Sequence, residues 1–552
     1  MMKTNIAEYF DEASLQRKDK TAVISTAEGD RSVTFGQLRE MSDKLACEFR
    51  NVGIARGAKV LMMLRPCPEF IATVFAVFKI GAIPVLIDPG MGRKNLLNCI
   101  RKTSPEAMIG ISRAHWIKYL FPFFFRTVRL SIAHGNFAPP WITSLESLLK
   151  KNTKDAIFKC EETKLDDTAA IVFTTGSTGP PKGVVYTHGI YITQLGIISK
   201  TYGAGPDEID MPAFPLFGLF SVALGMPIVI PDMDPSRPAN ADPEKIVAAL
   251  TRNNVTFSFG SPALWKVVCK YCIEKNIKIP KLKRVLMAGA PITAELHAML
   301  KKTISPDGVT HVPYGATEAL PIANFTGSEM LAETAAKTAE GAGYCIGRPI
   351  EGMEIKVIGA VNGPIERWSP SLELPQGLKG EIVVKGPVVT PCYYNEPAHT
   401  KNAKIADADG NIWHRMGDAG YYDEKGRLWF CGRKAHRVMT KDEILYSVCC
   451  EAIFNQHPDV ARSALVGIGP EGNQGAVIII EPRPGKMPCC DKGKSDFTDE
   501  LKKLGAKKDF TSRISQFLFH PSFPVDIRHN AKIFREQLAE WAASNSGIPA
   551  RD

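Results

Sequence analysis

The sequence contains no block of like charge, no internal repeat and no low-complexity segment. Its 68 lysines and arginines against 58 aspartates and glutamates leave a net charge of +10 over 552 residues. The densest basic stretch, residues 492–508, is interleaved with acidic residues. This pattern is typical of a solvated face rather than a nucleic-acid-binding patch, so we expect no nucleic-acid partner.

The cysteines also lack the spacing that is typical of a metal site. The 13 cysteines are scattered, and Cys269 and Cys272 form a lone CxxC with no second pair at the spacing of a zinc site. They lie in residues 263–275, which we expect to form an amphipathic helix, so buried thiols are favoured over a metal or redox site. An odd, unpatterned set of cysteines suits a reducing compartment, and we expect a cytoplasmic protein.

The first residues, MMKTNIAEYFDEAS, lack the apolar core of a signal peptide. Residues 211–231 carry no charge over 21 positions, but four prolines and two glycines make a poor helix. We expect a buried strand-and-loop segment beside an apolar pocket there, and no transmembrane span. Residues 116–130 mix aromatic with basic side chains; we expect them to face the core, with a peripheral membrane or partner contact as the alternative.

A chain of this length is too long to fold around a single hydrophobic core, so we expect at least two domains. Short apolar strands that end in Gly, Ser or Thr alternate with amphipathic stretches, which is typical of an α/β fold with functional loops at strand ends. We expect strands at residues 59–64, 83–87, 170–173, 255–259 and 285–287, and a helix at 69–79. Closely spaced strands at 355–358 and 381–385, followed by a hairpin at 421–430 with Glu-Lys-Gly (424–426) at its turn, predict a β-rich subdomain. A shorter α+β region follows a boundary near Ala435, with strands at 464–468 and 477–480.

The strongest chemical signal is TTGSTGPPKG at residues 174–183, directly after an apolar strand. Glycines let backbone N–H groups converge on an anion, hydroxyls add donors, and Lys182 adds positive charge. The loop differs from the GxxxxGK[ST] P-loop because Gly183 follows Lys182 and two prolines precede it. We expect a phosphate site built from Thr174, Thr175, Gly176, Ser177, Thr178, Gly179 and Lys182.

This motif resembles the signature loop of the adenylate-forming superfamily, which includes acyl-CoA synthetases, nonribosomal-peptide adenylation domains and luciferases. The resemblance covers nearly the whole chain. It implies an α/β protein with a large N-terminal AMP-binding domain (residues 1–434), built from two α/β sheets and a β-rich subdomain. A small, mobile α+β C-terminal domain (435–552) would follow, and ATP and Mg²⁺ would be used.

Further motifs arrive in the order found in that superfamily. The resemblance places Gly289, Ala290 and Pro291 against the adenine. It also assigns roles within YGATE, residues 314–318. Tyr314 would stack on adenine, beside Gly315 and Ala316. Thr317 would bond the α-phosphate, and Glu318 would bind Mg²⁺, which prefers carboxylate oxygen.

Two later motifs complete the nucleotide site. In HRMGDAGYYDEKGRLWFCGR, residues 414–433, the resemblance assigns Asp418 to the ribose hydroxyls, which a carboxylate can accept. It assigns Arg433 to the ribose and phosphate region. In PVDIRHNAKI, residues 524–533, Lys532 matches a catalytic lysine that reaches the substrate carboxylate and the α-phosphate. A mobile point cation suits charge that develops there.

The chain departs from thioester-forming members, whose pattern after the hinge runs roughly GRxKDxIKxxG. Here His436 stands at the usual acidic hinge position, and Glu443 falls near the expected glycine, where a bulky acid would crowd a phosphopantetheine arm. Gly218 stands where many acyl-CoA synthetases have histidine. These departures argue against a plain CoA ligase.

The strings IPDMDPSRPA, PYGATEALP, GRLWFCGRK and FPVDIRHNAKI resemble the olefin β-lactone synthetases of bacterial hydrocarbon biosynthesis. The resemblance implies adenylation of a long-chain 2-alkyl-3-hydroxy fatty acid, followed by attack of its own hydroxyl to close a β-lactone. Such an intramolecular attack is favoured because the hydroxyl and the activated acyl group are held close together. A base must remove the proton of that hydroxyl. His188 and His436 are the only candidates, and they are suggested only because they lie near the motifs in sequence.

Three alternatives stay open: a long-chain fatty acyl-CoA ligase, a fatty acyl-AMP ligase and a non-catalytic nucleotide- or lipid-binding homologue. The last is disfavoured because binding alone would not require Lys532. If the pathway resemblance holds, the partners would be a reductase that supplies the hydroxy acid and a decarboxylating hydrolase that consumes the lactone.

Overall fold

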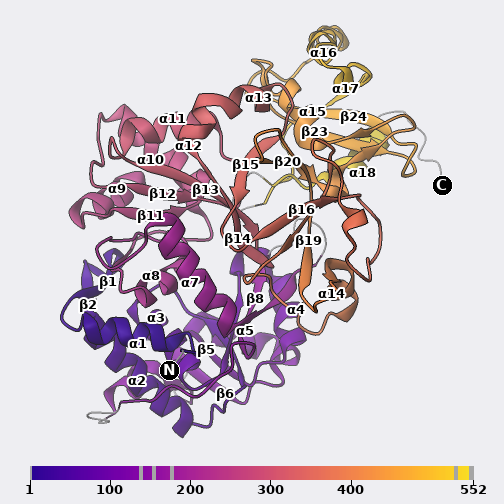
Figure 1. The fold of residues 1–552 in the computed structure, drawn as a ribbon. Coiled ribbons are helices and arrows are strands. Elements are labelled where there is room, and N and C mark those ends of the chain that lie inside the picture. The colour runs from indigo at the N-terminus through magenta and orange to yellow at the C-terminus, as the bar shows by residue number, and fades with distance from the viewer. Residues whose placement is uncertain (1–2, 136–140, 152–156, 175–179, 527–531, 546–552) are drawn as a thin grey trace.

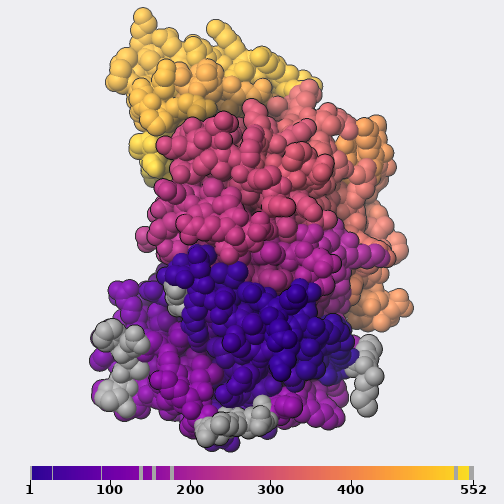
Figure 2. Space-filling model, turned by 90° about the vertical axis from the view of Figure 1, so that its left-hand side faces the viewer, coloured from indigo at the N-terminus to yellow at the C-terminus, as the bar shows by residue number. Residues whose placement is uncertain are grey.

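The computed structural model describes residues 3–135, 141–151, 157–174, 180–526 and 532–545. Figure 1 shows an N-terminal part at the bottom, a second α/β part above it, and a C-terminal α+β part at the top. In the space-filling view of Figure 2, the C-terminal segment forms a lobe above the rest of the chain. The expected α/β architecture is confirmed.

The first sheet has seven strands in the order β7-β6-β5-β3-β4-β8-β9, parallel except for the β8–β9 pair. Because successive strand residues point to opposite faces, Val60 and Met62 of β3 pack on one core and Leu61 on another. The strands are β3 (Lys59–Met63), β4 (Ile83–Ile87), β5 (Ala107–Ile111), β6 (Leu130–His134), β7 (Thr143–Ser144), β8 (Thr168–Thr174) and β9 (Lys182–Thr187).

Helices cover both faces of this sheet. One layer is formed by α1 (Ala7–Gln16), α2 (Phe35–Asn51), α3 (Pro68–Lys79) and α6 (Leu145–Lys150). The other is formed by α4 (Arg93–Thr103), α5 (Ser112–Leu120) and the short helix η3 (Pro122–Phe125). All twelve residues of α3 are buried, as expected for a helix that is apolar all round. The ammonium of Lys79, its last residue, lies 2.6 Å from Asp11 and 2.5 Å from Asp43, so the buried charge is paired.

The second sheet has ten strands, parallel from β11 to β13 and antiparallel beyond. The β-rich subdomain expected after residue 354 is therefore continuous with it. The strands are β11 (Phe257–Gly260), β12 (Arg284–Met287), β13 (Val309–Ala316), β14 (Ala319–Thr326), β15 (Tyr344–Pro349), β16 (Glu354–Ile358), β17 (Gly380–Lys385), β18 (Lys404–Ala406), β19 (Ile412–Tyr422) and β20 (Leu428–Arg433). Its helices include α9 (Pro243–Arg252), α10 (Pro262–Glu274) and α11 (Ala294–Thr303).

Helix α7 (His188–Tyr202) joins the two sheets. Its Leu195 packs into the core of the first sheet, and Ile197 and Tyr202 pack against residues of the second. A small third sheet, in the order β10-β1-β2, lies beside them and consists of β1 (Thr21–Ser25), β2 (Arg31–Thr34) and β10 (Ile228–Ile230).

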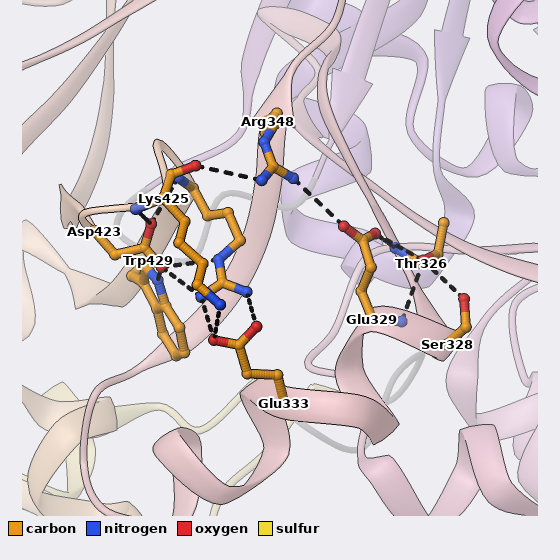
Figure 3. A network of polar contacts seen from close by, with 9 residues as sticks. Thr326, Ser328, Glu329, Glu333, Arg348, Asp423, Lys425 and Trp429 are labelled. Carbon is orange, nitrogen blue, oxygen red and sulfur yellow. Dashed lines mark hydrogen bonds and ion pairs between the residues drawn. The ribbon is translucent and has the colours of Figure 1, made fainter.

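Charged side chains brace the β19–β20 hairpin (Figure 3). Glu333 accepts hydrogen bonds from Arg427 and from Lys425 at the hairpin turn, 2.9 Å and 2.8 Å long. These bonds lower the pKa of Glu333 to about 2. Asp423 accepts from Arg427 and from the Trp429 indole, at 2.8 Å and 2.9 Å. The network connects the turn to residues 326–339, which carry the helices that follow β14.

The C-terminal part contains a sheet in the order β23-β24-β25. Its elements are α15 (Ser447–Phe454), β23 (Val460–Ile468), β24 (Gly475–Pro482), α16 (Asp491–Gly505), β25 (Gln516–Phe519) and α18 (Arg535–Asn545). The charged stretch 492–508 falls mainly on α16, where only Phe497, Leu501 and Gly505 are buried. The expected solvated face is confirmed.

Two expectations need correction. Residues 211–231 contain a nine-residue helix, α8 (Pro215–Ala223), rather than only strand and loop. The helix forms because Pro215 occupies its first turn, where a proline costs no hydrogen bond. Residues 116–130 do not face the core throughout, since the side chains of Trp116, Leu120 and Phe123 are more than half exposed.

Within the described residues, no helix is both long and apolar enough to cross a membrane. All 13 cysteines are free, and Cys269 and Cys272 are buried on α10 as expected.

Candidate active site

A cavity of about 1810 Å³ runs between the two large sheets. Its lining extends from α4 and α5 of the first sheet, along α7, to Lys532 and Arg535 of the C-terminal part. It has a polar region at the ends of the second sheet and an apolar region around α7 and α8. The site residues expected from sequence that line it are Gly289, Ala290, Pro291, Tyr314, Gly315, Ala316, Thr317, Glu318, Asp418, Arg433 and Lys532.

The expected phosphate loop is only partly described. Lys182 opens β9 and is the register partner of Thr174, the last residue of β8. Thr175, Gly176, Ser177, Thr178 and Gly179 lie outside the described residues. The two strands therefore fix the points at which the loop leaves and re-enters the sheet.

Tyr314, Asp418 and Arg433 form one hydrogen-bonded unit. The Tyr314 hydroxyl donates to Asp418 Oδ2 over 2.6 Å, and Arg433 Nη1 donates to Asp418 Oδ1 over 2.6 Å. Asp418 and Arg433 are direct register partners on β19 and β20. Asp418 raises the pKa of Arg433, and burial followed by the nearby carboxylate raises the pKa of Tyr314 well above its usual range. The unit presents a fixed carboxylate and an aromatic face to the cavity.

Glu318 lies at the turn between β13 and β14, and backbone packing forces this hairpin to be tight. A side chain on Gly315 would place its Cβ only 2.6 Å from the Ala319 carbonyl oxygen, so glycine is required there. Glu318 Oε1 accepts a hydrogen bond from the Tyr393 hydroxyl over 2.6 Å. Its Oε2 has no hydrogen-bond partner among the residues that the structure describes.

Positive charge surrounds Glu318. Lys182 Nζ lies 5.2 Å from the centre of the Tyr393 ring, on the same tyrosine that binds Glu318. Lys404 donates to Thr390 Oγ1 over 3.4 Å, and Thr390 in turn bonds the Glu318 backbone carbonyl. Burial lowers the pKa of Lys404 to about 7, an effect that the Glu318 charge opposes.

The same charges act on His414. Burial, then Lys404, Arg433 and Lys182, lower the pKa of His414 well below its usual range. A cluster of cations around one cavity-lining carboxylate suits a polyphosphate and a divalent metal ion. The oxygen donor of Glu318 fits Mg²⁺, which takes few protein ligands besides phosphate.

Tyr393, Lys404 and His414 were not identified from the sequence. Tyr393 and Lys404 lie between motifs and carry no pattern of their own, and only the folded chain brings them near Glu318. His414 was included in a quoted motif without a role.

Two hydrogen bonds to Asp526 hold the backbone of Lys532, which lines the cavity. Its backbone N–H donates to Asp526 Oδ1 over 2.8 Å, and the Asp526 N–H donates back to the Lys532 carbonyl over 3.1 Å. Beyond it, Arg535 at the start of α18 pairs with buried Glu451 at 2.7 Å. The structure therefore brings Lys532, more than 200 residues distant in sequence from YGATE, to the lining that contains Thr317 and Glu318.

The apolar part of the cavity is rich in aromatic rings. Phe217 of α8 stacks on Phe259 of β11 with ring centres 3.9 Å apart. Phe214, Phe220 and Tyr191 also contribute to the lining. Gly218 lies against Pro212 and Ile228, each 3.1 Å from where a Cβ would stand. A histidine at position 218 would have to displace both neighbours, which explains this departure from acyl-CoA synthetases by packing.

A buried carboxyl lies in this apolar region. Asp210 is 1% exposed and accepts a hydrogen bond of 2.6 Å from the Ser221 hydroxyl. Desolvation raises its pKa to about 7, against the opposing effect of that hydrogen bond.

The two histidines considered as bases differ in position. His188 does not line the cavity; its Nδ1 accepts from the Ile6 N–H over 3.2 Å, and burial lowers its pKa to about 4. His436 does line the cavity and lies 3.3 Å from Glu536, while burial lowers its pKa to about 4. Glu443 closes the turn between β21 (Val438–Met439) and β22 (Ile444–Leu445) and does not line the cavity in this structure.

Comparison with known proteins agrees with this geometry. Residues 10–394 match the family described as AMP-binding enzyme. The chain is 40% identical to the olefin beta-lactone synthetase of Xanthomonas campestris pv. campestris, over 98% of this chain and 97% of that protein. It is also 40% identical to the olefin beta-lactone synthetase of Stenotrophomonas maltophilia, over 98% of each chain.

Solved structures with the same fold include the amide bond synthetase McbA from Marinactinospora thermotolerans, with a TM-score of 0.78 at 21% identity, covering 97% of this chain and 99% of that one. The anthranilate CoA ligase AuaEII in complex with anthranoyl-AMP has a TM-score of 0.78 at 16% identity, covering 98% of both chains. The chain thus belongs to the AMP-binding enzyme family and has the fold of the adenylate-forming superfamily.

Proposed function

We propose that this enzyme adenylates a long-chain 2-alkyl-3-hydroxy fatty acid and then closes it to a β-lactone. The observation that carries the proposal is one continuous cavity, which joins the cationic region around Glu318 to the aromatic region around Phe217. A substrate with a polar head and bulky alkyl chains matches this division. The 40% identity to two olefin beta-lactone synthetases over almost the full chain supports the same reaction.

In the first step, a carboxylate oxygen of the acid attacks the α-phosphorus of ATP and pyrophosphate leaves. Tyr314 and the residues 289–291 would bind adenine, Asp418 and Arg433 the ribose, and Thr317 the α-phosphate. The phosphate loop 174–179 and Lys182 would hold the remaining phosphates. Lys532 would stabilise the charge that develops between carboxylate and α-phosphate. A magnesium ion on Glu318 would neutralise phosphate charge.

In the second step, the β-hydroxyl oxygen bonds to the acyl carbon, the hydroxyl proton leaves, and AMP is expelled. The four-membered ring forms without any thiol acceptor. Intramolecular attack gains from the fixed proximity of hydroxyl and mixed anhydride. Neither histidine is suited to accept that proton, since His188 does not line the cavity and a pKa of about 4 makes His436 a weak base.

We infer that residues 435–552 form a domain that moves about a hinge near Ala435, as its separate three-stranded sheet suggests. In a reaction sequence, the hydroxy acid must come from reduction of a 3-keto acid, and the lactone must be consumed by a decarboxylating hydrolase.

Product analysis by mass spectrometry tests the proposal. The protein is incubated with ATP, Mg²⁺ and a long-chain 2-alkyl-3-hydroxy acid, with and without CoA, beside a Lys532→Ala control. A product lighter than the acid by one water, formed equally without CoA, is the expected result. A CoA adduct that requires CoA would instead establish an acyl-CoA ligase, and an accumulating acyl-AMP would indicate an acyl-AMP ligase. If no ATP is consumed with any acid, the chain is a binding protein.

A further inference from the structure

Helix α5 and its surroundings expose large apolar side chains to solvent. Trp116, Tyr119 and Leu120 of α5, Phe123 of η3, and Trp141 are between 44% and 71% exposed. They form one surface: the Tyr119 ring centre lies 6.2 Å from both Trp116 and Trp141, and the Trp141 indole donates to the Tyr119 hydroxyl. We call these five residues the aromatic face. Soluble chains rarely expose such contiguous patches without a binding role.

One arginine lies over the phenylalanine of the aromatic face, and two more lie over the rings next to it. The guanidinium of Arg126 lies 5.7 Å from the centre of the Phe123 ring. Arg93 and Arg101 of α4 lie 5.5 Å and 6.0 Å from the neighbouring rings of Phe121 and Phe124. Between residues 93 and 134 the chain has eight basic residues and one acid, Glu106, whose charge is paired with Lys59 at 2.8 Å. The segment that carries most of the aromatic face is therefore both aromatic and basic in composition.

The inner side of the same helices is a wall of the catalytic cavity. Ala114 and Ile117 of α5 line the cavity three residues apart, while Trp116 and Leu120 point outward from the other side of the helix. Arg93 and Leu96 of α4 line it as well. Figure 1 shows α4 and α5 in the lower half of the molecule, away from the C-terminal strands at the top. Helix α5 thus lies between the cavity and the aromatic face.

We propose that the aromatic face docks on an anionic lipid bilayer and that the long-chain acid enters the cavity from that surface. Tryptophan and tyrosine favour the membrane–water interface, where an apolar ring and a polar group are both satisfied. The bordering arginines complement anionic headgroups, and each basic residue near such a surface adds to binding. The proposal of docking depends only on the properties of this surface. The proposal that the acid enters from the bilayer depends also on the proposed function.

Vesicle co-sedimentation tests docking without nucleotide or acid. The full chain is mixed with vesicles of phosphatidylcholine alone, or of phosphatidylcholine with about one-third phosphatidylglycerol, at low and high salt. Binding to the anionic vesicles that weakens with salt is expected. Leu120→Asp and Arg126→Glu should each lower the partition coefficient about fivefold or more. Leu15→Asp on α1, where Leu15 is 62% exposed, and Arg252→Glu on α9 are the matched controls and should bind like the parent.

Retained ATP binding in each variant confirms that it folds. Equal binding of the parent and Leu120→Asp, or no binding to anionic vesicles at low salt, would overturn docking. Docking would also be overturned if sedimentation velocity showed that the parent self-associates and that Leu120→Asp does not. The aromatic face would then be an interface between copies of the chain.

Entry is tested separately by turnover. Leu120→Asp should slow turnover of a long-chain hydroxy acid presented in anionic vesicles and leave that of a short, water-soluble hydroxy acid unchanged. Equal slowing of both acids would overturn entry from the bilayer. A parent that binds vesicles but turns over neither acid would refute the proposed reaction while docking stands.

Discussion

Tyr314 and Asp418 lie on different strands of the second sheet, β13 and β19, and the phenol of Tyr314 donates to Asp418 Oδ2 over 2.6 Å. The opposite oxygen of the same carboxylate accepts from Arg433 at 2.6 Å. The group expected to contact adenine therefore positions the group expected to contact ribose.

Asp418→Asn should weaken ATP binding by roughly 1.5–3 kcal/mol, or about 10- to 150-fold, because the ribose hydroxyls lose an ionised acceptor. Tyr314→Phe keeps the ring and removes one hydrogen bond, so a loss of about 1 kcal/mol is expected. Calorimetric titration with a non-hydrolysable ATP analogue measures both. An unchanged dissociation constant for Asp418→Asn would refute the ribose assignment.

Lys532→Ala should reduce pyrophosphate release by about 10²-fold or more, since it removes a cation aimed at developing charge. ATP affinity should change little because adenine and ribose contacts remain. Lys502→Ala on exposed α16, where Lys502 lies 3.6 Å from Asp499, is the control. Pyrophosphate release that persists at the parental rate in Lys532→Ala would contradict the catalytic role.

Glu318→Gln should raise the Mg²⁺ concentration needed for half-maximal pyrophosphate release by about tenfold or more, because an amide is a poorer ligand than a carboxylate. Tyr393→Phe, which removes the 2.6 Å hydrogen bond to Glu318, should shift the same titration less. Glu366→Gln is a surface control, since Glu366 is exposed and pairs with Lys401 at 3.3 Å. Identical Mg²⁺ titrations for Glu318→Gln and the parent would argue against metal binding there.

ATP binding should take up a proton near neutral pH. Burial lowers the pKa of Lys404 to about 7, so the free enzyme is only partly protonated there at pH 7 to 8. Bound phosphates favour the charged form, so ATP affinity should fall as pH rises from about 7 to 9. Calorimetry in buffers of different ionisation enthalpy measures the uptake. Lys404→Arg, which stays charged, should abolish it; uptake that survives in this variant must come from another group.

Asp210 should make the protein less stable as pH rises through the weakly acidic range. Its folded-state pKa is raised from 3.8 to about 7, so between these values the unfolded state binds fewer protons than the folded state. Stability from this group is complete below about pH 4 and falls until about pH 7, by a few kcal/mol at most.

Asp210→Asn removes this titration. The free energy of unfolding of the variant minus that of the parent, from urea titrations, should therefore increase from pH 4 to pH 8 and level off above. Asp307→Asn, an exposed control, should show no such trend. A difference that is independent of pH would mean that Asp210 is ionised in the folded protein.

Much of the fold could be predicted from local pattern. The strand at 83–87 matches β4, and the helix at 69–79 matches α3 to within one residue, because a continuous apolar run between glycines and prolines has few alternatives. The hairpin with its turn at 424–426 was also predicted, since Glu-Lys-Gly between alternating strands is a turn signal. The helix α8 was missed because prolines were taken as helix breakers, whereas Pro215 begins the helix.

The sequence by itself determined the chemistry of the site: a glycine- and hydroxyl-rich loop with a lysine after a strand, a YGATE turn, and single carboxylate, arginine and lysine residues in fixed order. Only the tertiary structure decided that Tyr393 and Lys404 join Glu318, and that the outer side of α5 is exposed while its inner side lines the cavity. Local pattern records which residues alternate or cluster along the chain. It cannot record contacts between side chains 75 residues apart, such as the hydrogen bond of Tyr393 to Glu318. Nor can it decide which side of an aromatic helix is covered, because burial depends on what the rest of the chain packs against it.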